Sequence, residues 1–140
     1  MTSSRSEIAR SLLLEEAGRA GIETAEGAAS GVLRVWARFA HRFGRLIGGG
    51  GIRALQDRSI SVAAVRFTWL TPPPEGFGDD WQALRTAFES RTVTEGVAGF
   101  EEVVAALVAL LGRFIGDALV GHLLHEMWPG VFPGDPKEPM

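Results

Sequence analysis

The pattern Gly-Arg-x-Ile-Gly occurs twice in this chain, at residues 44–48 and at residues 112–116. The offset, 112 minus 44, is 68 residues, and it also aligns apolar neighbours such as Phe39 with Leu107. Each copy lies between stretches in which apolar residues recur every three or four positions, the period of an amphipathic helix. Two helical hairpins that each carry an apolar stripe can bury those stripes against each other. The sequence therefore predicts an all-α helical bundle of five to six helices, built from two repeated helical hairpins.

Capping residues and prolines divide the chain into predicted segments. Ser4 and Glu7 stand in capping-box spacing, so residues 1–22 are predicted to contain an N-terminal helix. Residues 24–129 are predicted to form the duplicated bundle. Residues 130–140 are rich in proline, and we expect an extended or flexible tail there.

Three further sequence signals predict where helices begin or end within the bundle. Gly48 to Gly51 are expected to form a turn after the first long helix. Asp79 is predicted to cap the short helix that follows it. Thr92 and Glu95 form a second capping-box pair and should open a long helix that is broken at Gly116. That helix is apolar nearly all round, as expected of an element covered by neighbours or by a partner subunit.

The residues around the two motifs read GRLIGGGGIRALQDRS, followed by FTWL, and GRFIGDALVGHLLHEMW. They resemble a group of small bacterial all-helical proteins of unknown function, in which two L-I-G-type helix-turn-helix units are separated by a proline-bearing loop. The resemblance covers roughly residues 30–130. It implies the same helical fold, and it implies no activity for any residue of this chain.

Composition and motifs argue against an enzyme. The chain has no cysteine, which excludes disulfides, thiolate metal sites and cysteine nucleophiles. No nucleophile elbow or comparable catalytic signature is present. Neighbouring carboxylates such as Glu101 and Glu102 point in different directions on a helix. We therefore expect no catalytic activity and no cofactor.

The hydropathy pattern indicates the location of the protein in the cell. The most apolar run, Val103 to Gly112, is shorter than the roughly 20 apolar residues that a membrane span needs. Charged residues such as Glu7 and Arg10 interrupt the stretch where a secretory signal would be apolar. The sequence therefore predicts a cytoplasmic protein without integral membrane association.

A basic stripe marks the polar side of the second predicted helix. Residues 31–66 contain seven arginines against one aspartate, a net charge of +6, so the rest carries −9 to reach the total of −3. Such a stripe can bind nucleic acid or an anionic membrane. The pI near 5.6 favours instead pairing with the acidic segments 15–26 and 79–102, within the fold or across a dimer. We therefore predict no nucleic-acid partner. The stripe consists of Arg34, Arg38, His41, Arg42 and Arg45.

Two patterns raise the question of a small ligand or metal. His122, His125 and Glu126 can meet one metal ion, because residues three or four apart share a helical face. They lack the H-E-x-x-H order of helical zinc sites, and the apolar face of their helix leaves His125 pointing outward, so solvated histidines are the favoured interpretation. The amides of Gly48 to Gly51 can attract a phosphate, with Arg45 nearby, yet the run has no G-K-[ST] ending and follows a helix. A flexible turn is favoured there.

The functional prediction is a non-enzymatic regulatory or protein-protein interaction module that self-associates as a homodimer. Large aromatics are common interface anchors, and the four tryptophans are expected to be exposed around a small bundle. Two alternatives stay open: a small-ligand sensor with a pocket between the two helical repeats, and peripheral binding to an anionic surface through the basic helix. The interaction candidates are Trp36, Arg38, Arg42, Arg45, Trp69, Trp81 and Trp128.

Overall fold

The computed structural model of this chain describes residues 5–132. This part of the chain contains six α-helices and one short 3-10 helix and no strand, which confirms the predicted all-α fold of five to six helices. None of the described helices is long and apolar enough to cross a membrane. The elements are α1 (Arg5–Gly21), α2 (Ala25–Ile47), α3 (Gly49–Ala64), η1 (Thr68–Leu70), α4 (Gln82–Glu89), α5 (Val93–Ile115) and α6 (Asp117–Met127).

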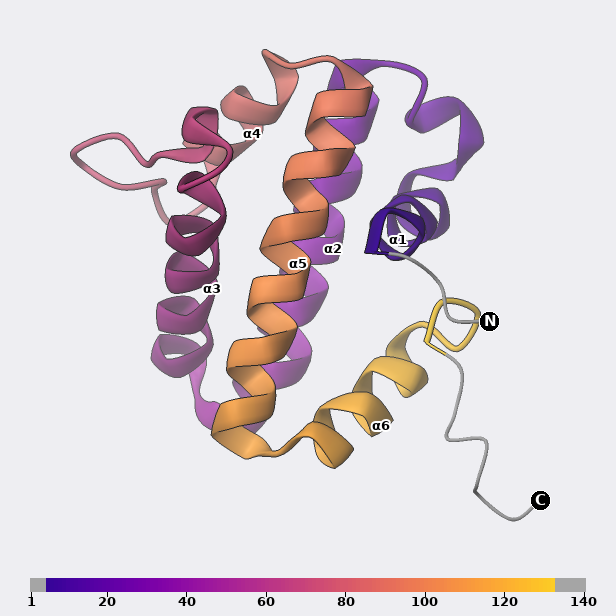
Figure 1. Cartoon of the computed structure of the whole chain (residues 1–140). Coiled ribbons are helices and arrows are strands. Elements are labelled where there is room, and N and C mark those ends of the chain that lie inside the picture. Colours follow the sequence, from indigo (N-terminus) through magenta and orange to yellow (C-terminus); the bar gives the residue numbers. More distant parts are fainter. Residues whose placement is uncertain (1–4, 133–140) are drawn as a thin grey trace.

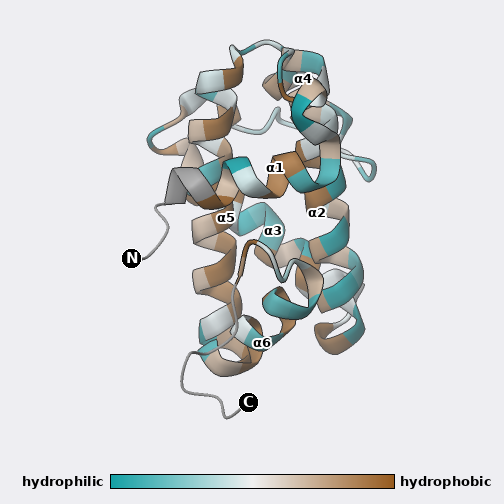
Figure 2. Ribbon diagram, turned by 90° about the vertical axis from the view of Figure 1, so that its right-hand side faces the viewer, coloured by the Kyte–Doolittle hydropathy of each residue, from teal (hydrophilic) through white to brown (hydrophobic). Residues whose placement is uncertain are grey.

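Helices α2 and α5 run in the same direction through the middle of the molecule (Figure 1). Helix α3 turns back from the end of α2 and packs against both α2 and α5. Helix α1 crosses α2 and α5 on the opposite side, and α6 turns away from the end of α5 toward α1 (Figures 1 and 2). The short helix α4 packs against α2. The two long helices are therefore flanked by α3 on one side and by α1 on the other.

Aromatic side chains fill the space where α2 and α5 meet. The ring of Trp36, in α2, meets the ring of Phe100, in α5, edge to face with centroids 6.5 Å apart. Phe39 packs on Trp36 and stacks on Phe43, and all four rings are fully buried. Burying a side chain of this size stabilises the fold by about 1.5–3 kcal/mol. Side chains therefore occupy the space between the long helices, where the sensor hypothesis places its pocket.

The two long helices have matching lengths and ends. Each spans 23 residues, and each begins after a threonine whose side chain accepts a hydrogen bond from a backbone amide in the first turn, Thr24 in α2 and Thr92 in α5. The capping box of Thr92 and Glu95 is confirmed. Each helix ends at a glycine with positive φ, 84° at Gly48 and 96° at Gly116. The partner helices differ, since α3 has 16 residues and α6 has 11. The duplication itself stays a prediction.

The turn that the glycine run forms is shorter than predicted. Gly48 alone leaves the helical conformation, and Gly49 to Gly51 form the first turn of α3. The amide of Ile52 donates to the carbonyl of Gly48 at 3.0 Å, so the helical hydrogen bonding of α3 begins immediately. A single residue with positive φ suffices to reverse the chain, because glycine adopts that conformation without a Cβ clash. The predicted turn after the first long helix is therefore confirmed at Gly48, and the expectation that all four glycines form it is wrong.

The start of α4 also differs from the prediction. Trp81, not Asp79, occupies the N-cap position and has a left-handed backbone with φ of 59°. The amide of Gln82 donates to the side chain of Asp80 at 3.2 Å, which supplies part of the missing cap. The connection before α4 therefore ends two residues later than the capping rule placed it.

The chain ends can be compared with the predictions only in part. Ser4, the predicted N-terminal cap, lies outside the described residues, and α1 ends at Gly21, within the predicted segment 1–22, with a kink at Gly18. Val131 is buried and Phe132 is half-buried against the core. The first residues of the predicted flexible tail therefore belong to the packed domain. Residues 133–140 lie outside the described part of the chain.

Candidate functional site

Two of the four candidate tryptophans are core residues. Trp36 is fully buried and Trp128 is 2% exposed, so the expectation that they are exposed anchors is wrong. Trp36 lies on the side of α2 that faces α5, and Trp128 follows α6 and packs on Phe39 with ring centroids 5.4 Å apart. Each ring fills the interior of the bundle, where burial of apolar surface stabilises it most.

The other two tryptophans are half-buried within the fold. A Cβ at Gly99 would lie 2.5 Å from Cζ2 of Trp69, so the missing side chain of Gly99 makes room for this indole. Trp81 lies under the guanidinium of Arg53, which is 3.8 Å from the ring centroid. Both rings therefore have intramolecular partners, which accounts for their placement without a binding partner.

The basic stripe of α2 is partly neutralised by groups inside the fold. The guanidinium of Arg38 donates to the Glu16 carboxylate at 2.6 Å and to the carbonyl of Met127 at 3.2 Å. Arg34 donates to the Glu16 carbonyl at 2.7 Å, and Nε1 of Trp128 donates to the Glu16 carboxylate at 3.1 Å. The favoured interpretation, internal pairing with the acidic segment 15–26, is confirmed for Arg38.

Glu16 is the group on which these contacts converge. Burial alone raises the pKa of a carboxyl group, because it removes water from the charged form. Here the hydrogen bonds from Trp128 and Arg38 and the positive charges of Arg38 and Arg34 outweigh burial, and the pKa of Glu16 lies below its ordinary value of 4.5. Glu16 is therefore a charged group that links α1 to α2 and to the end of α6 through hydrogen bonds.

The three possible metal ligands, His122, His125 and Glu126, do not all contact one another. Nε2 of His122 lies 3.5 Å from Oε2 of Glu126, and the other oxygen of Glu126 accepts a hydrogen bond from Arg42 at 3.2 Å. Nδ1 of His125 lies 2.7 Å from the carbonyl oxygen of Phe132. Among residues 5–132, no three histidine or acidic side chains are grouped so that they could hold a metal ion.

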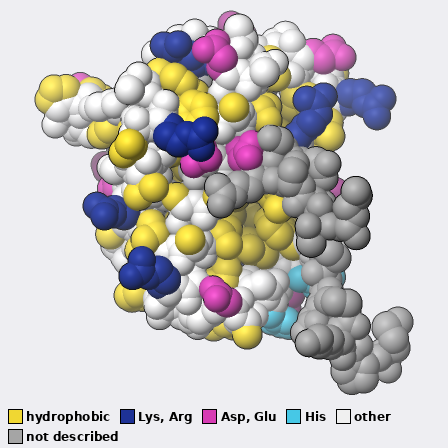
Figure 3. All heavy atoms as spheres, in the orientation of Figure 1, with side chains coloured by type: hydrophobic (Ala, Val, Ile, Leu, Met, Phe, Trp, Pro, Cys, Tyr) yellow, Lys and Arg dark blue, Asp and Glu magenta, His cyan; other side chains and the backbone are white. Residues whose placement is uncertain are grey.

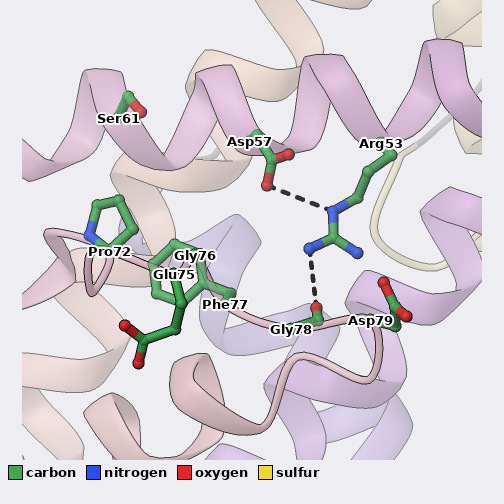
Figure 4. Close-up of a pocket in the computed structure, with 9 residues that line it drawn as sticks. All are labelled: Arg53, Asp57, Ser61, Pro72, Glu75, Gly76, Phe77, Gly78 and Asp79. Carbon is green, nitrogen blue, oxygen red and sulfur yellow. Dashed lines mark hydrogen bonds and ion pairs between the residues drawn. The ribbon is translucent and has the colours of Figure 1, made fainter.

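A polar cavity of about 310 Å³ lies between α3 and the connection before α4 (Figure 4). Arg53 lies at one end of the lining residues, where its guanidinium binds Asp57 at 3.3 Å and the carbonyl of Gly78 at 2.8 Å (Figure 4). Both contacts use the guanidinium of Arg53, the one basic side chain that lines this cavity. The cavity therefore offers no unpaired cation to an anionic ligand. Its lining residues are Arg53, Asp57, Ser61, Pro72, Glu75, Gly76, Phe77, Gly78 and Asp79.

An apolar groove of about 290 Å³ lies along α5, with lining residues from α1 and α6 as well. Figure 3 shows a continuous hydrophobic area in the middle of this face, with an acidic side chain above it and another below it. In Figure 2, hydrophobic residues continue along α5 below the crossing of α1. The sequence indicated an apolar surface all round this helix but did not identify which side remains open. The groove is lined by Ile8, Val104, Ala105, Val108, Ala109 and Phe132, with Glu101 and Asp117 as its polar members.

The end of the bundle at which α2 and α5 both stop has exposed side chains of two kinds. Leu46 and Phe114, at the variable position of the two Gly-Arg-x-Ile-Gly motifs, are 49% and 64% exposed. Arg45 and Arg113, at the preceding position, are exposed too. Neither arginine has a hydrogen bond or ion pair with any residue of the described chain. Of the candidate arginines in α2, Arg45 is therefore the one without a partner among residues 5–132.

Comparisons with protein-family models, with curated proteins and with solved structures found no match to this chain.

Proposed function

We propose that this protein is a non-enzymatic interaction module and that two copies associate through the groove on α5. The observation that carries the proposal is the apolar surface at Ala105, Val108 and Ala109, which continues around α5 beyond its buried face. A helix at the surface of a monomer usually turns charged and polar residues to water. Contiguous exposed apolar surface marks sites at which another molecule binds. Association would remove this surface from water.

Charge supports a second copy as the partner. The stretch Val103–Gly112 of α5 contains no charged residue, and Glu102, just before it, has an ion pair with Arg66 at 2.9 Å. A twofold interface places the same patch of both copies face to face, so a charged patch would repel itself. The uncharged middle of this helix surface meets no such penalty, and the two acidic lining residues of the groove, Glu101 and Asp117, precede and follow this stretch in the sequence. The small side chains of Ala105 and Ala109 also let a second helix approach closely.

The proposal is tested by placing a charge at the centre of this surface. Ala109→Arg adds a guanidinium to an exposed position of α5, and in a face-to-face dimer it would place two positive charges close together. We expect the wild type to sediment as a dimer at micromolar concentration and the variant to sediment as a monomer. Ala54→Arg is the matched control, because Ala54 is an exposed alanine of α3 away from the groove. It should leave the dimer unchanged.

Two outcomes contradict this proposal. One is a wild-type monomer at high micromolar concentration, and the other is a dimer that Ala109→Arg does not weaken. A monomer that carries an apolar small molecule, seen as added mass in native mass spectrometry, would support the small-ligand sensor instead, with the ligand in the groove and not between the repeats.

A further inference from the structure

The end of the bundle at which α2 and α5 stop differs chemically from the groove. Three of the six large hydrophobic side chains exposed in the described chain lie here: Leu46, Phe114 and Leu119, the last being 40% exposed. Leu46 and Phe114 stand in the last turns of α2 and α5, and Leu119 stands in the first turn of α6. Both long helices end at the lower edge of Figure 1. We call this end of the bundle the tip and define it by the exposed residues Arg45, Leu46, Arg113, Phe114 and Leu119.

Positive charge accompanies the exposed apolar residues of the tip. Arg45 and Arg113 are exposed and have no partner among the described residues, whereas Arg38 and Arg42 of α2 are both paired. A basic residue in the last turn of a helix interacts favourably with the helix dipole, which is one reason for an arginine at either position. The dipole does not explain a leucine or phenylalanine exposed beside each arginine.

We propose that the tip binds an anionic lipid surface. In this arrangement Phe114 and Leu46 enter the boundary between headgroups and acyl chains, and Arg45 and Arg113 lie at the lipid phosphates. Arginine suits this position because its long aliphatic part can lie along apolar surface while its charge stays in the polar layer. The proposal concerns a different surface from the groove and does not depend on dimer formation.

Charge argues for lipid and against a second copy of the chain at the tip. Two tips facing each other would bring four arginines together, and the acidic residue at this end of α6, Asp117, contributes a single negative charge from each copy. Like charges repel across such an interface. Nucleic acid would attract the arginines but would leave Leu46 and Phe114 in water. An anionic bilayer accommodates both kinds of side chain.

The test is flotation of the purified full chain with vesicles of phosphatidylcholine alone or of phosphatidylcholine with phosphatidylglycerol. We expect binding to the anionic vesicles and weakening by salt, because the charge attraction is screened. Each arginine near an anionic surface is worth about 1 kcal/mol, so Arg45→Ala should lower the partition coefficient about fivefold. The double variant Leu46→Ser, Phe114→Ser should lower it roughly tenfold or more, since both insertions are lost.

Matched controls separate the tip from the rest of the surface. Val65→Ser removes a side chain that is 82% exposed at the far end of α3, and Arg58→Ala removes an exposed arginine in the middle of α3. Both should bind like the wild type. The proposal is overturned if the wild type fails to bind anionic vesicles, if it binds neutral vesicles equally well, or if the tip variants bind unchanged. Tighter binding to duplex DNA than to vesicles, lost in Arg45→Ala, would also overturn it in favour of nucleic acid.

Discussion

The indole Nε1 of Trp128 donates a hydrogen bond of 3.1 Å to the carboxylate of Glu16, which joins the end of α6 to α1 across 112 residues of sequence. Arg38 binds the same carboxylate from α2 at 2.6 Å. Three segments that are distant in sequence therefore share one charged group. This junction holds α1 and the C-terminal segment in the positions that border the groove on α5.

Removing the charge of Glu16 should destabilise the fold. Glu16→Gln keeps the size of the side chain and one accepting oxygen but removes the negative charge that faces Arg38 and Arg34. Hydrogen bonds to a charged group are worth about 1.5–3 kcal/mol, so we expect the free energy of unfolding to fall by about 2 kcal/mol in urea titrations. Glu15→Gln, at the exposed neighbouring position, is the control and should change it by less than about 0.5 kcal/mol. Equal effects of both changes would contradict the structural role of Glu16.

The same junction should respond to acid. The pKa of Glu16 is lower in the folded protein than its ordinary value of 4.5, so the contacts of the carboxylate contribute their full stability above that value. The contribution is lost as the pH falls through the folded pKa, because the carboxyl group then binds a proton in both states. We therefore expect the difference in unfolding free energy between the wild type and Glu16→Gln to be constant near neutral pH and to shrink below pH 4.5. If the difference in unfolding free energy between the wild type and Glu16→Gln grew as the pH fell, it would contradict the lowered pKa of Glu16.

The contact between Gly99 and Trp69 gives a test of packing. Gly99→Ala places a Cβ 2.5 Å from the Trp69 ring, which also packs edge to face on Phe88 at 5.1 Å and has little room to move. We expect a loss of about 1–3 kcal/mol from overpacking, although alanine favours a helix. Gly121→Ala, in α6, meets no atom within 4 Å and should stabilise the protein by about 0.5–1 kcal/mol. Thermal unfolding of the two variants should therefore shift in opposite directions.

The two reversing glycines should be equally intolerant of a side chain. Gly48 and Gly116 have φ, ψ values of 84°, 155° and 96°, 140°, a region that residues with a Cβ rarely adopt. Gly48→Ala and Gly116→Ala should each cost about 1–3 kcal/mol, as measured by urea unfolding. Gly50→Ala is the control, because Gly50 is helical and nothing lies within 4 Å of its Cβ position. A penalty at one turn alone would weaken the predicted duplication.

Local signals in the sequence predicted most of the helix boundaries. Thr92 with Glu95 opens α5 and Gly116 closes it, because capping and breaking depend on residues within one turn of the helix end. The start of α4 was predicted wrongly because Trp81 adopts a left-handed conformation. That conformation is rare outside glycine and asparagine, and the ring is held by Arg53 from another helix. No local pattern encodes such a contact.

The candidate site was harder to predict than the fold. Trp36 and Trp128 were expected at the surface, and their burial depends on which side of α2 faces α5 and on where α6 folds back. The apolar groove depends on the gap between α1 and α6, which is a property of packing between distant segments. The sequence did indicate its main element, since α5 has apolar residues on more sides than its neighbours can cover.

Native mass spectrometry of the wild-type chain at micromolar concentration tests the proposed self-association most directly. One chain has a mass of 15.0 kDa, so the account predicts a species of twice that mass with nothing else bound. A spectrum with the 15.0 kDa species alone at the same concentration would contradict the proposal that α5 of one copy covers α5 of another.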